Sequence, residues 1–364
     1  MSRIALFLPD LAGGGAERVF LHLAGAFREA GHDVDLVLAR ARGPLLGQVP
    51  GGVQVVDLRA PAGPFGTLGL ALWATIGLTR YLRRRRPEVL LSTLTGANLA
   101  ALLARLLSRS GTRLVVRVAC ALENVRGHFR RWLMGLLYPR ADRVVALTDH
   151  MRRQLVAELR LPEERVVCIP NPVDQERIRR KAIEPLEDPW LLEADEPLLL
   201  GVGRLSKEKD FDTLIRAVAR VRAQQPARLA ILGEGPERPA LEALGSELRL
   251  GCDLNLPGFT DNPYAWIKRC TLFVLSSRWE GHPNVVLEAL ALQRPVVMTA
   301  YDPGAWDYAQ LPGVKVVPAG DPAALTQAIV EQLRRPPEPH SIGLPAAVAS
   351  STDRYRKLVN EITP

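Results

Sequence analysis

The sequence predicts two doubly wound α/β domains, each built around a parallel sheet. Short, continuous apolar runs alternate with longer helical patterns along the whole chain, as expected of strands covered by helices on both faces of a sheet. At 364 residues the chain also exceeds the size at which one hydrophobic core usually keeps growing. Glycine-rich or charged turns follow several apolar runs, where open α/β sheets bind their ligands. We therefore expect a binding site in a cleft between the two domains.

The first half begins with an apolar strand that runs straight into a glycine turn, so we expect no cleavable signal there. Its strands are expected at Ile4–Leu8, Asp33–Leu38, Val53–Leu58, Val89–Ser92, Leu114–Val118 and Arg143–Ala146. Its helices are expected at Glu17–Ala30, from the low seventies to Arg85, and at Asn98–Leu107, Phe129–Leu137 and His150–Glu158. The alternation breaks at Val166–Pro172 and in the proline- and acid-rich stretch Pro185–Pro197, where we place the linker.

The second half repeats the alternation. Its strands are expected at Leu198–Val202, Leu229–Leu232, Leu254–Leu256, Leu272–Leu275, Val296–Met298 and Val314–Val317. We thus predict an N-terminal domain over residues 1–184 and a C-terminal domain over residues 185–345. Residues 346–364 have a helical pattern and no strand to partner, so we expect this helix to pack back on the first domain.

Composition and charge narrow the function classes. The longest apolar run, residues 65–79, is shorter than the ~20 residues that a membrane span needs, which favours a buried or interfacial helix. The four cysteines lack metal-binding spacing and predict reduced thiols in a cytosolic protein. Residues 1–184 carry 28 Lys and Arg against 16 Asp and Glu, whereas the remainder carries 19 against 23. The basic half predicts an anionic partner, either acidic phospholipid or a pyrophosphate-linked lipid. Nucleic acid is disfavoured because the sequence has no such motif and only 5% aromatic residues.

Three glycine-containing turns are candidate ligand contacts. Gly14 and Gly15 follow the first strand and would let backbone N–H groups approach an anion. They do not form a dinucleotide fingerprint, because Arg18 occupies the place of its third glycine. Gly233 and Phe259 lie in turns after later strands, where the backbone can approach a ligand closely. An ordinary turn or loop is the alternative at all three places.

The turn Gly203–Asp210 carries a stronger phosphate signal. It follows the first strand of the second half and holds two of the six lysines of the chain. Arg204 can fork onto a diphosphate, and Lys209 adds a point charge. A solvated charged turn is the alternative interpretation.

Residues 277–297 contain two acids eight positions apart, Glu280 in a turn and Glu288 about one turn into the following helix. Pro283 suits the first position of that helix and would leave the N–H groups of Asn284 and Val285 free at its positive end. A helix end flanked by carboxylates fits a ligand that is both anionic and rich in hydroxyls, such as a nucleotide-sugar. The alternative is a pair of solvated acids before a buried helix.

Other patterns of potentially functional residues in the sequence do not indicate a metal site or a nucleophile. Asp33-Val34-Asp35 has the form of a metal–diphosphate motif, but it lies far in sequence from the phosphate turns, and we interpret it as coincidental. The six histidines show no zinc-binding spacing, and no nucleophilic serine elbow is found in the sequence.

Together these motifs resemble glycosyltransferase family 4, the retaining nucleotide-sugar transferases with the GT-B fold. The resemblance spans nearly the whole chain, and the GRL…K and E…E blocks are its specific parts. The matching blocks are GGGAERV, VVALTDHMRRQL, VVCIPNPVD, GVGRLSKEKDFDTLIRA, LAILGEGPERPAL and SSRWEGHPNVVLEALALQRPVV.

The resemblance implies roles for single residues of the second half. Arg204 and Lys209 look like the pair that binds the donor diphosphate. Glu280 matches the acid that contacts the donor sugar, and Glu288 matches the acid that binds the ribose hydroxyls.

The resemblance also implies roles for backbone segments. His282–Val286 (His282, Pro283, Asn284, Val285 and Val286) corresponds to the loop whose backbone supports the phosphates and the sugar. Gly14 and Gly15 correspond to the loop that closes over the donor. No metal or other cofactor is implied, because the Arg/Lys pair and a helix dipole neutralise the departing diphosphate.

The chain departs from the family pattern at two places. Many relatives have a polar residue just after the strand equivalent to Leu114–Val118, where this chain reads Ala119–Asn124. Glu123 or Asn124 is the candidate for that role. Residues 300–307, AYDPGAWD, replace a Cys-Pro-x-Gly-Pro-Arg-Glu-like loop.

The resemblance therefore implies metal-independent, retaining sugar transfer from a nucleotide-diphosphate-sugar, with a UDP-sugar favoured. The implied acceptor is a glycan or lipid-linked glycan of a bacterial surface polysaccharide. The basic clusters Arg83–Arg86 and Arg126–Arg131 favour a cytoplasmic protein that is peripheral on the inner face of the anionic membrane. The alternatives are a catalytically impaired, donor-binding scaffold subunit and a non-hydrolysing sugar-nucleotide epimerase of the same fold.

Overall fold

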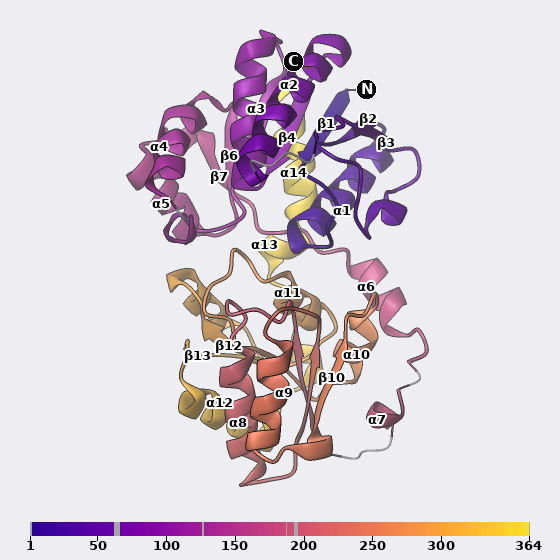
Figure 1. Ribbon diagram of the computed structural model, residues 1–364, viewed down its shortest axis with the longest axis vertical. Coiled ribbons are helices and arrows are strands. Elements are labelled where there is room, and N and C mark those ends of the chain that lie inside the picture. Colours follow the sequence, from indigo (N-terminus) through magenta and orange to yellow (C-terminus); the bar gives the residue numbers. More distant parts are fainter. Residues whose placement is uncertain (1, 62–65, 126, 187, 193–195, 364) are drawn as a thin grey trace. The chain divides into compact units, whose positions relative to one another are not determined.

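The computed structural model describes residues 2–61, 66–125, 127–186, 188–192 and 196–363. Arg126 of the second basic cluster, residue 65 of the apolar run and the side chain of Asn124 lie outside this described part. The chain forms two compact units (Figure 1). Unit 1 comprises Met1–Val173 and Ala346–Pro364, and unit 2 comprises Asp174–Pro345.

Unit 1 is built on a parallel sheet of seven strands in the order β3-β2-β1-β4-β5-β6-β7. The strands are β1 (Arg3–Leu8), β2 (Asp33–Leu38), β3 (Gln54–Asp57), β4 (Val89–Thr93), β5 (Arg113–Arg117), β6 (Arg143–Ala146) and β7 (Val166–Cys168). The sheet grows in opposite directions from β1 and β4, which makes the ends of these two strands its topological switch point. The strand β7 was not expected. Residues 166–168 pair with β6 and extend the sheet, so the break in alternation at this place is a short edge strand and no linker.

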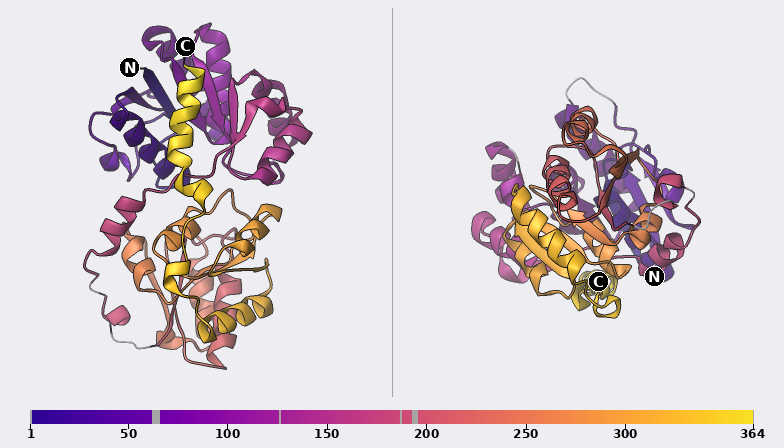
Figure 2. Two further views of the ribbon diagram at one scale, coloured as in Figure 1. Left: turned by 180° about the vertical axis from the view of Figure 1, so that it is seen from behind. Right: turned by 90° about the horizontal axis from the view of Figure 1, so that it is seen from below.

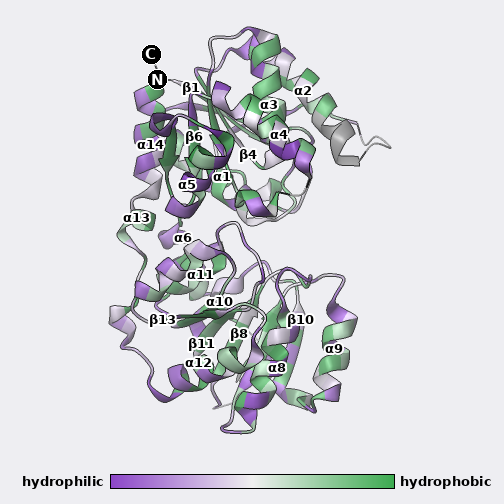
Figure 3. Cartoon of the chain, turned by 90° about the vertical axis from the view of Figure 1, so that its left-hand side faces the viewer, coloured by the Kyte–Doolittle hydropathy of each residue, from purple (hydrophilic) through white to green (hydrophobic). Residues whose placement is uncertain are grey.

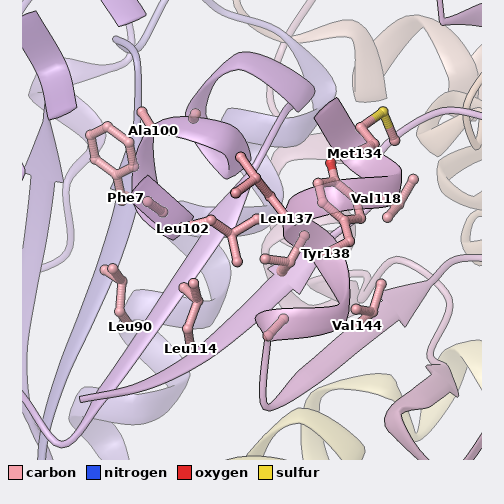
Figure 4. Packing of buried hydrophobic residues seen from close by; sticks show 14 of the residues in the cluster. Phe7, Leu90, Ala100, Leu102, Leu114, Val118, Met134, Leu137, Tyr138 and Val144 are labelled. Atoms are coloured by element: carbon pink, nitrogen blue, oxygen red, sulfur yellow. The ribbon is translucent and has the colours of Figure 1, made fainter. Parts of the chain in front are cut away.

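Helices cover both faces of this sheet. One layer consists of α2 (Gly66–Arg85), α3 (Thr95–Ser108), α4 (His128–Leu137) and α5 (Asp149–Leu159). Buried side chains of these helices pack on Phe7, Leu90 and Leu114 of the strands, and Figure 4 shows part of this core. The opposite layer consists of α1 (Gly15–Glu29) and α14 (Ser351–Ile362). Continuous apolar strands are thus explained by burial on both faces.

The C-terminal segment belongs to unit 1. After the short helix α13 (Ala346–Ala349), α14 lies beside α1, and Tyr355, Leu358 and Val359 are buried in the same core as Phe20. Figure 2 shows α14, in yellow, running along this unit.

The boundary between the units lies at residues 173 and 174, and not at 184 and 185 as the sequence predicted. The reason is α6 (Gln175–Ala182), which contacts α10 and α11 of unit 2. Asn262 also donates from Nδ2 to the Lys181 carbonyl at 2.8 Å. A helical pattern does not reveal which of two sheets a helix covers, so this assignment required the packing.

Unit 2 repeats the architecture with six parallel strands in the order β10-β9-β8-β11-β12-β13. They are β8 (Leu198–Val202), β9 (Arg228–Leu232), β10 (Leu254–Gly258), β11 (Leu272–Leu275), β12 (Val296–Ala300) and β13 (Val314–Pro318). The helices besides α6 are α7 (Pro189–Leu192), α8 (Phe211–Arg222), α9 (Arg238–Glu247), α10 (Pro263–Arg269), α11 (Asn284–Ala291) and α12 (Pro322–Arg334). Here the switch point lies between β8 and β11, which pair directly.

Among the described residues, none of the helices is both long enough and apolar enough to cross a membrane. The predicted apolar run falls in α2, where Ala74 and Leu78 are buried but Leu72 and Trp73 are exposed.

Candidate functional site

The candidate site of unit 2 lies at the switch point of its sheet. Because β8 and β11 are neighbours, the turn after β8 meets the turn after β11, although they are about seventy residues apart in sequence. The first turn carries Arg204 and Lys209, and the second carries Glu280. This is the position at which open α/β sheets bind ligands.

Lys209 and Glu280 form the centre of this site. The Lys209 Nζ lies 2.5 Å from Glu280 Oε1, and the two side chains are only 17% and 14% exposed. Ser277 is fully buried and donates from its Oγ to the same carboxylate oxygen at 2.7 Å. A largely buried carboxylate held by an ammonium and a hydroxyl has a fixed orientation, and charge-assisted bonds of this kind are the stronger ones.

The two turns are joined by further contacts. Ser276 Oγ donates to the Lys209 carbonyl at 2.8 Å, and the Arg278 N–H donates to the Glu208 carbonyl at 2.8 Å. The Arg278 Nε also lies 2.9 Å from Asp210 Oδ2, and this hydrogen bond raises the pKa of the arginine. Asp210 is buried with a φ of 48°, so its ion pair stabilises a turn in the left-handed region. The turn that carries Lys209 is therefore held at both its backbone and its side chains.

Gly203 and Gly233 permit the close approach of neighbouring turns. A Cβ on Gly203 would lie 3.0 Å from Lys209 Cε, so this glycine leaves room for the lysine stem. A Cβ on Gly233, whose φ is +138°, would lie 1.9 Å from the Gly203 carbonyl oxygen. The structure thus gives Gly233 a packing role, and its contact with a donor stays a prediction.

Arg204 and Phe259 lie at the exposed margin of this region. Arg204 is exposed at the start of the turn after β8. Phe259 is 60% exposed and follows Gly258, whose carbonyl accepts from the Gly233 N–H at 2.8 Å. Both side chains are accessible to a ligand.

The helix α11 begins one residue later than predicted. Pro283 precedes it as the capping residue with ψ of 93°, and Asn284 and Val285 are its first two residues. The reason is that proline occupies an extended conformation here, while its carbonyl accepts from the Val286 N–H at 3.0 Å. The Val286 N–H is therefore already hydrogen-bonded within the first turn of the helix.

Glu288 lies in a different environment from Glu280. It sits in the second turn of α11, and the hydroxyl of the buried Tyr264 donates to its Oε1 at 3.4 Å. The two acids therefore have separate partners, an ammonium and a serine hydroxyl for one and a phenol for the other.

His282 is positioned by the segment that departs from the family pattern. Residues Pro303–Gln310 form a 3₁₀ helix capped by Asp302, whose Oδ1 accepts from the Ala305 N–H at 2.9 Å. The Tyr308 hydroxyl lies 3.2 Å from His282 Nε2. Burial raises the pKa of the Tyr308 phenol, so it remains a neutral hydrogen-bonding group.

The remaining predicted residues belong to unit 1. Gly14 caps α1 and Gly15 is its first residue; a Cβ on Gly14 would lie 2.5 Å from a carboxylate oxygen of Glu17. Burial raises the pKa of Glu17. Glu123 is exposed in a short 3₁₀ turn after β5, and the Gln154 Nε2 donates to it at 3.4 Å.

The Asp33-Val34-Asp35 motif has structural partners. Asp33 pairs with Arg3 at 2.8 Å, and the fully buried Asp35 accepts from the Tyr81 hydroxyl at 2.6 Å. Each carboxylate thus has a structural partner, although Oδ1 of the buried Asp35 has no hydrogen-bond partner among the described residues.

Sequence reasoning missed Ser277, Tyr264 and the Asp210–Arg278 pair. Ser277 had a usable signal, because a serine just past a buried strand and three residues before a candidate acid is placed to orient that acid. Tyr264 and Asp210 had none, since their partners are distant in sequence.

Comparison with known proteins gives two family matches. A model described as Glycosyltransferase Family 4 matches residues 13–177, and one described as Glycosyl transferases group 1 matches residues 196–335. A similar protein is the N-acetylgalactosamine-N,N'-diacetylbacillosaminyl-diphospho-undecaprenol 4-alpha-N-acetylgalactosaminyltransferase of Campylobacter jejuni. It is 29% identical over 84% of this chain and 82% of its own length. The lipopolysaccharide core biosynthesis glycosyltransferase LpsE of Rhizobium meliloti is 27% identical over 87% of this chain and 84% of its own length.

Solved structures share the fold. HepE of Anabaena, in complex with UDP and glucose, has a TM-score of 0.77 at 19% identity, covering 100% of this chain and 97% of its own. A structure from Listeria monocytogenes described as a UDP-N-acetylglucosamine 2-epimerase has a TM-score of 0.73 at 14% identity, covering 99% of this chain and 96% of its own. The fold alone therefore does not separate transferases from epimerases.

Proposed function

Because the chain belongs to the family 4 glycosyltransferases and has their GT-B fold, we propose that it transfers a sugar, with retention of configuration, from a nucleotide-diphosphate-sugar to a glycan or lipid-linked acceptor in bacterial surface polysaccharide synthesis. The observation that carries the proposal is the Lys209–Glu280–Ser277 cluster at the switch point of unit 2. A UDP-sugar is the favoured donor, in keeping with the UDP held by the similar structure of HepE.

On the donor side, the positively charged groups bind the leaving diphosphate. Arg204 and Lys209 bind its oxygens, and the start of α11 adds the dipole of a helix N-terminus. Glu280 contacts the transferred sugar and Glu288 the ribose. Stabilisation of the developing negative charge on the diphosphate is the main contribution to rate, and it uses no metal ion.

On the acceptor side, unit 1 supplies a basic surface. Its charge favours a membrane-bound, anionic acceptor, and the Campylobacter relative is named for a substrate linked to diphospho-undecaprenol. The proposed location is the inner face of the cytoplasmic membrane.

The test is a transfer assay preceded by a thermal-shift screen against a panel of nucleotide-sugars. Stabilisation by one donor class and formation of a glycosylated acceptor support the proposal. In Arg204→Ala and Glu280→Ala we expect transfer to fall by a hundred- to a thousandfold, or about 3–4 kcal/mol, with unchanged melting. Wild-type turnover in either variant would refute its role. Donor binding without transfer would identify a scaffold subunit, and acceptor-independent conversion of the donor an epimerase.

A further inference from the structure

The outer face of α4 carries large apolar side chains that the fold does not bury. Phe129, Trp132 and Leu136 are 65%, 61% and 45% exposed. Their spacing of three and four residues places them on one face of the helix, whereas Met134 and Leu137 reach the core from the other face. The rings of Phe129 and Trp132 stack with centroids 5.8 Å apart. The helix is therefore apolar on two faces, and the core uses only one.

Neighbouring helices extend this apolar surface. On α3, which contacts both α2 and α4, Leu103, Leu106 and Leu107 are exposed at the same helical spacing. Leu72 and Trp73 are exposed on α2. Eight of the thirteen exposed large hydrophobic side chains of the described residues thus lie on these three helices, which Figure 3 shows on one side of unit 1. Scattered apolar residues need no explanation, but a concentration of this kind marks an interaction surface.

Arginines lie next to the exposed apolar side chains of these helices, which form one apolar row on each helix. The last turn of α2 carries Arg83, Arg84 and Arg85, with Arg86 following, and all four are exposed. An Arg83 guanidinium nitrogen donates to the Leu107 carbonyl at 2.8 Å, which places a positive charge at the end of the α3 row. On α4, Arg130 and Arg131 stand between Phe129 and Trp132 in the sequence. Aromatic and arginine side chains occur together at protein interfaces and at membrane interfaces alike. A run of four adjacent, exposed arginines beside apolar helix faces is typical of a surface that contacts anionic lipid headgroups.

We propose that the exposed faces of α2, α3 and α4 form a docking surface for an anionic phospholipid bilayer. Phe129, Trp132 and Leu136 enter the boundary between headgroups and acyl chains, and the arginines at the end of α2 contact lipid phosphates. The helix α4 begins five residues after Glu123, so docking holds the lipid phase close to the candidate acceptor-side residue. This proposal deepens the acceptor side of the proposed function and rests on it.

The experiment measures co-sedimentation of the full chain with vesicles of phosphatidylcholine alone or of phosphatidylcholine with phosphatidylglycerol. We expect binding to the anionic vesicles only, weakened by salt. The triple substitution Phe129→Ser, Trp132→Ser and Leu136→Ser should lower this binding by about tenfold or more. Its control, Ile183→Ser, changes a side chain of unit 2 that is 78% exposed and should bind as the parent does.

A second pair of variants tests the charges without altering the apolar rows. Arg84→Gln with Arg86→Gln should weaken binding about fivefold per arginine. Arg334→Gln with Arg335→Gln, at the end of α12 in unit 2, should not weaken it. Brominated lipid should quench the parent more than Trp132→Phe, while Trp306→Phe should leave quenching unchanged.

The docking proposal is overturned by equal binding to neutral and anionic vesicles, or by parent-like binding of both the serine and the glutamine variants. It is also overturned if the serine substitutions convert a dimer to a monomer and leave vesicle binding intact, because the surface then belongs to a second copy. Vesicle binding is measured without donor or acceptor, and transfer to a detergent-solubilised acceptor is measured separately. Because the two assays are separate, a failure of the docking proposal can be distinguished from a failure of the transfer proposal.

Discussion

In the proposed reaction, Lys209 and Glu280 bind two different parts of the donor. The diphosphate requires the ammonium and the sugar requires the carboxylate, yet the structure pairs the two at 2.5 Å. Under the proposed roles, a diphosphate competes with Glu280 for Lys209. These roles therefore couple donor binding to the position of Glu280 through this ion pair.

The first prediction concerns this coupling. Glu280→Gln removes the competing charge and keeps the shape, so UDP should bind about fivefold more tightly, the equivalent of ~1 kcal/mol, while transfer falls at least a hundredfold. Calorimetric titration with UDP and a transfer assay measure the two effects. Glu288→Gln is the control and should weaken UDP binding, because its proposed contact is the ribose. Weaker UDP binding by Glu280→Gln would contradict the coupling.

The second prediction concerns Ser277, which is fully buried and donates a hydrogen bond to the Glu280 carboxylate. Hydrogen bonds to charged groups contribute about 1.5–3 kcal/mol, so Ser277→Ala should lower kcat/KM roughly ten- to a hundredfold. Steady-state kinetics with varied donor measure this, and the melting temperature shows whether the variant stays folded. Ser246→Ala, which removes only a bond to the Glu242 carbonyl on α9, should have no effect. A parent-like kcat/KM in Ser277→Ala would exclude a positioning role.

At the scale of elements, unit 1 depends on a helix from the far end of the chain. Along α14, buried and exposed positions alternate with helical spacing, and Leu358 and Val359 pack into the core that includes Phe20 and Phe27 of α1. The sequence predicted that this helix packs back on the first domain, and the structure confirms it and adds that it lies against α1.

The third prediction follows from that packing. Leu358→Ala should lower the free energy of unfolding of unit 1 by about 2–4 kcal/mol, because it leaves a cavity between α14 and α1. The neighbouring exposed Lys357→Ala should change it by less than about 0.5 kcal/mol. Calorimetric unfolding measures both, with UDP added to shift the transition of unit 2. If Leu358→Ala instead lowered the UDP-sensitive transition, the helix would belong to unit 2.

At the scale of the whole molecule, charge divides between the units. Counted over the two units, unit 1 carries 27 Lys and Arg against 15 Asp and Glu, and unit 2 carries 20 against 24. The imbalance noticed between the sequence halves therefore survives the corrected boundary. The excess of positive charge thus lies on unit 1, the proposed acceptor side. On unit 2, the proposed donor side, the cations used are the two at the site, Arg204 and Lys209.

The fourth prediction is that these placed cations make a metal ion dispensable. Arg204 and Lys209 are proposed to neutralise the charge that develops on the leaving diphosphate, so this task does not need a divalent cation. Transfer should be unchanged by excess EDTA and should not rise with added Mg²⁺ or Mn²⁺, whereas Arg204→Ala should lower it by a hundred- to a thousandfold. A transfer rate that falls with EDTA and returns with a divalent cation would contradict this prediction.

Much of this architecture follows from local signals. The six strands of unit 2 begin within two residues of their predicted positions, because buried parallel strands are continuous apolar runs bounded by turns. The turns that contain Arg204, Lys209 and Glu280, and the helix that contains Glu288, were likewise predicted from their composition. The strand β7 was missed because a segment of three residues is too short to show an alternating pattern. The helix α6 was placed in the wrong unit because an amphipathic pattern does not show which sheet the apolar face packs on.

The sequence by itself determined the fold class, the turns that follow the strands and the residues that carry charge there. Only the tertiary structure decided that Lys209 and Glu280 bind each other, that Ser277 donates to the same carboxylate, and that α1 is the helix of unit 1 beside which α14 lies. The physical reason is that strand and helix patterns report burial within one segment. Contacts between segments depend on strand order, and the adjacency of β8 and β11 is set by the packing of the whole sheet.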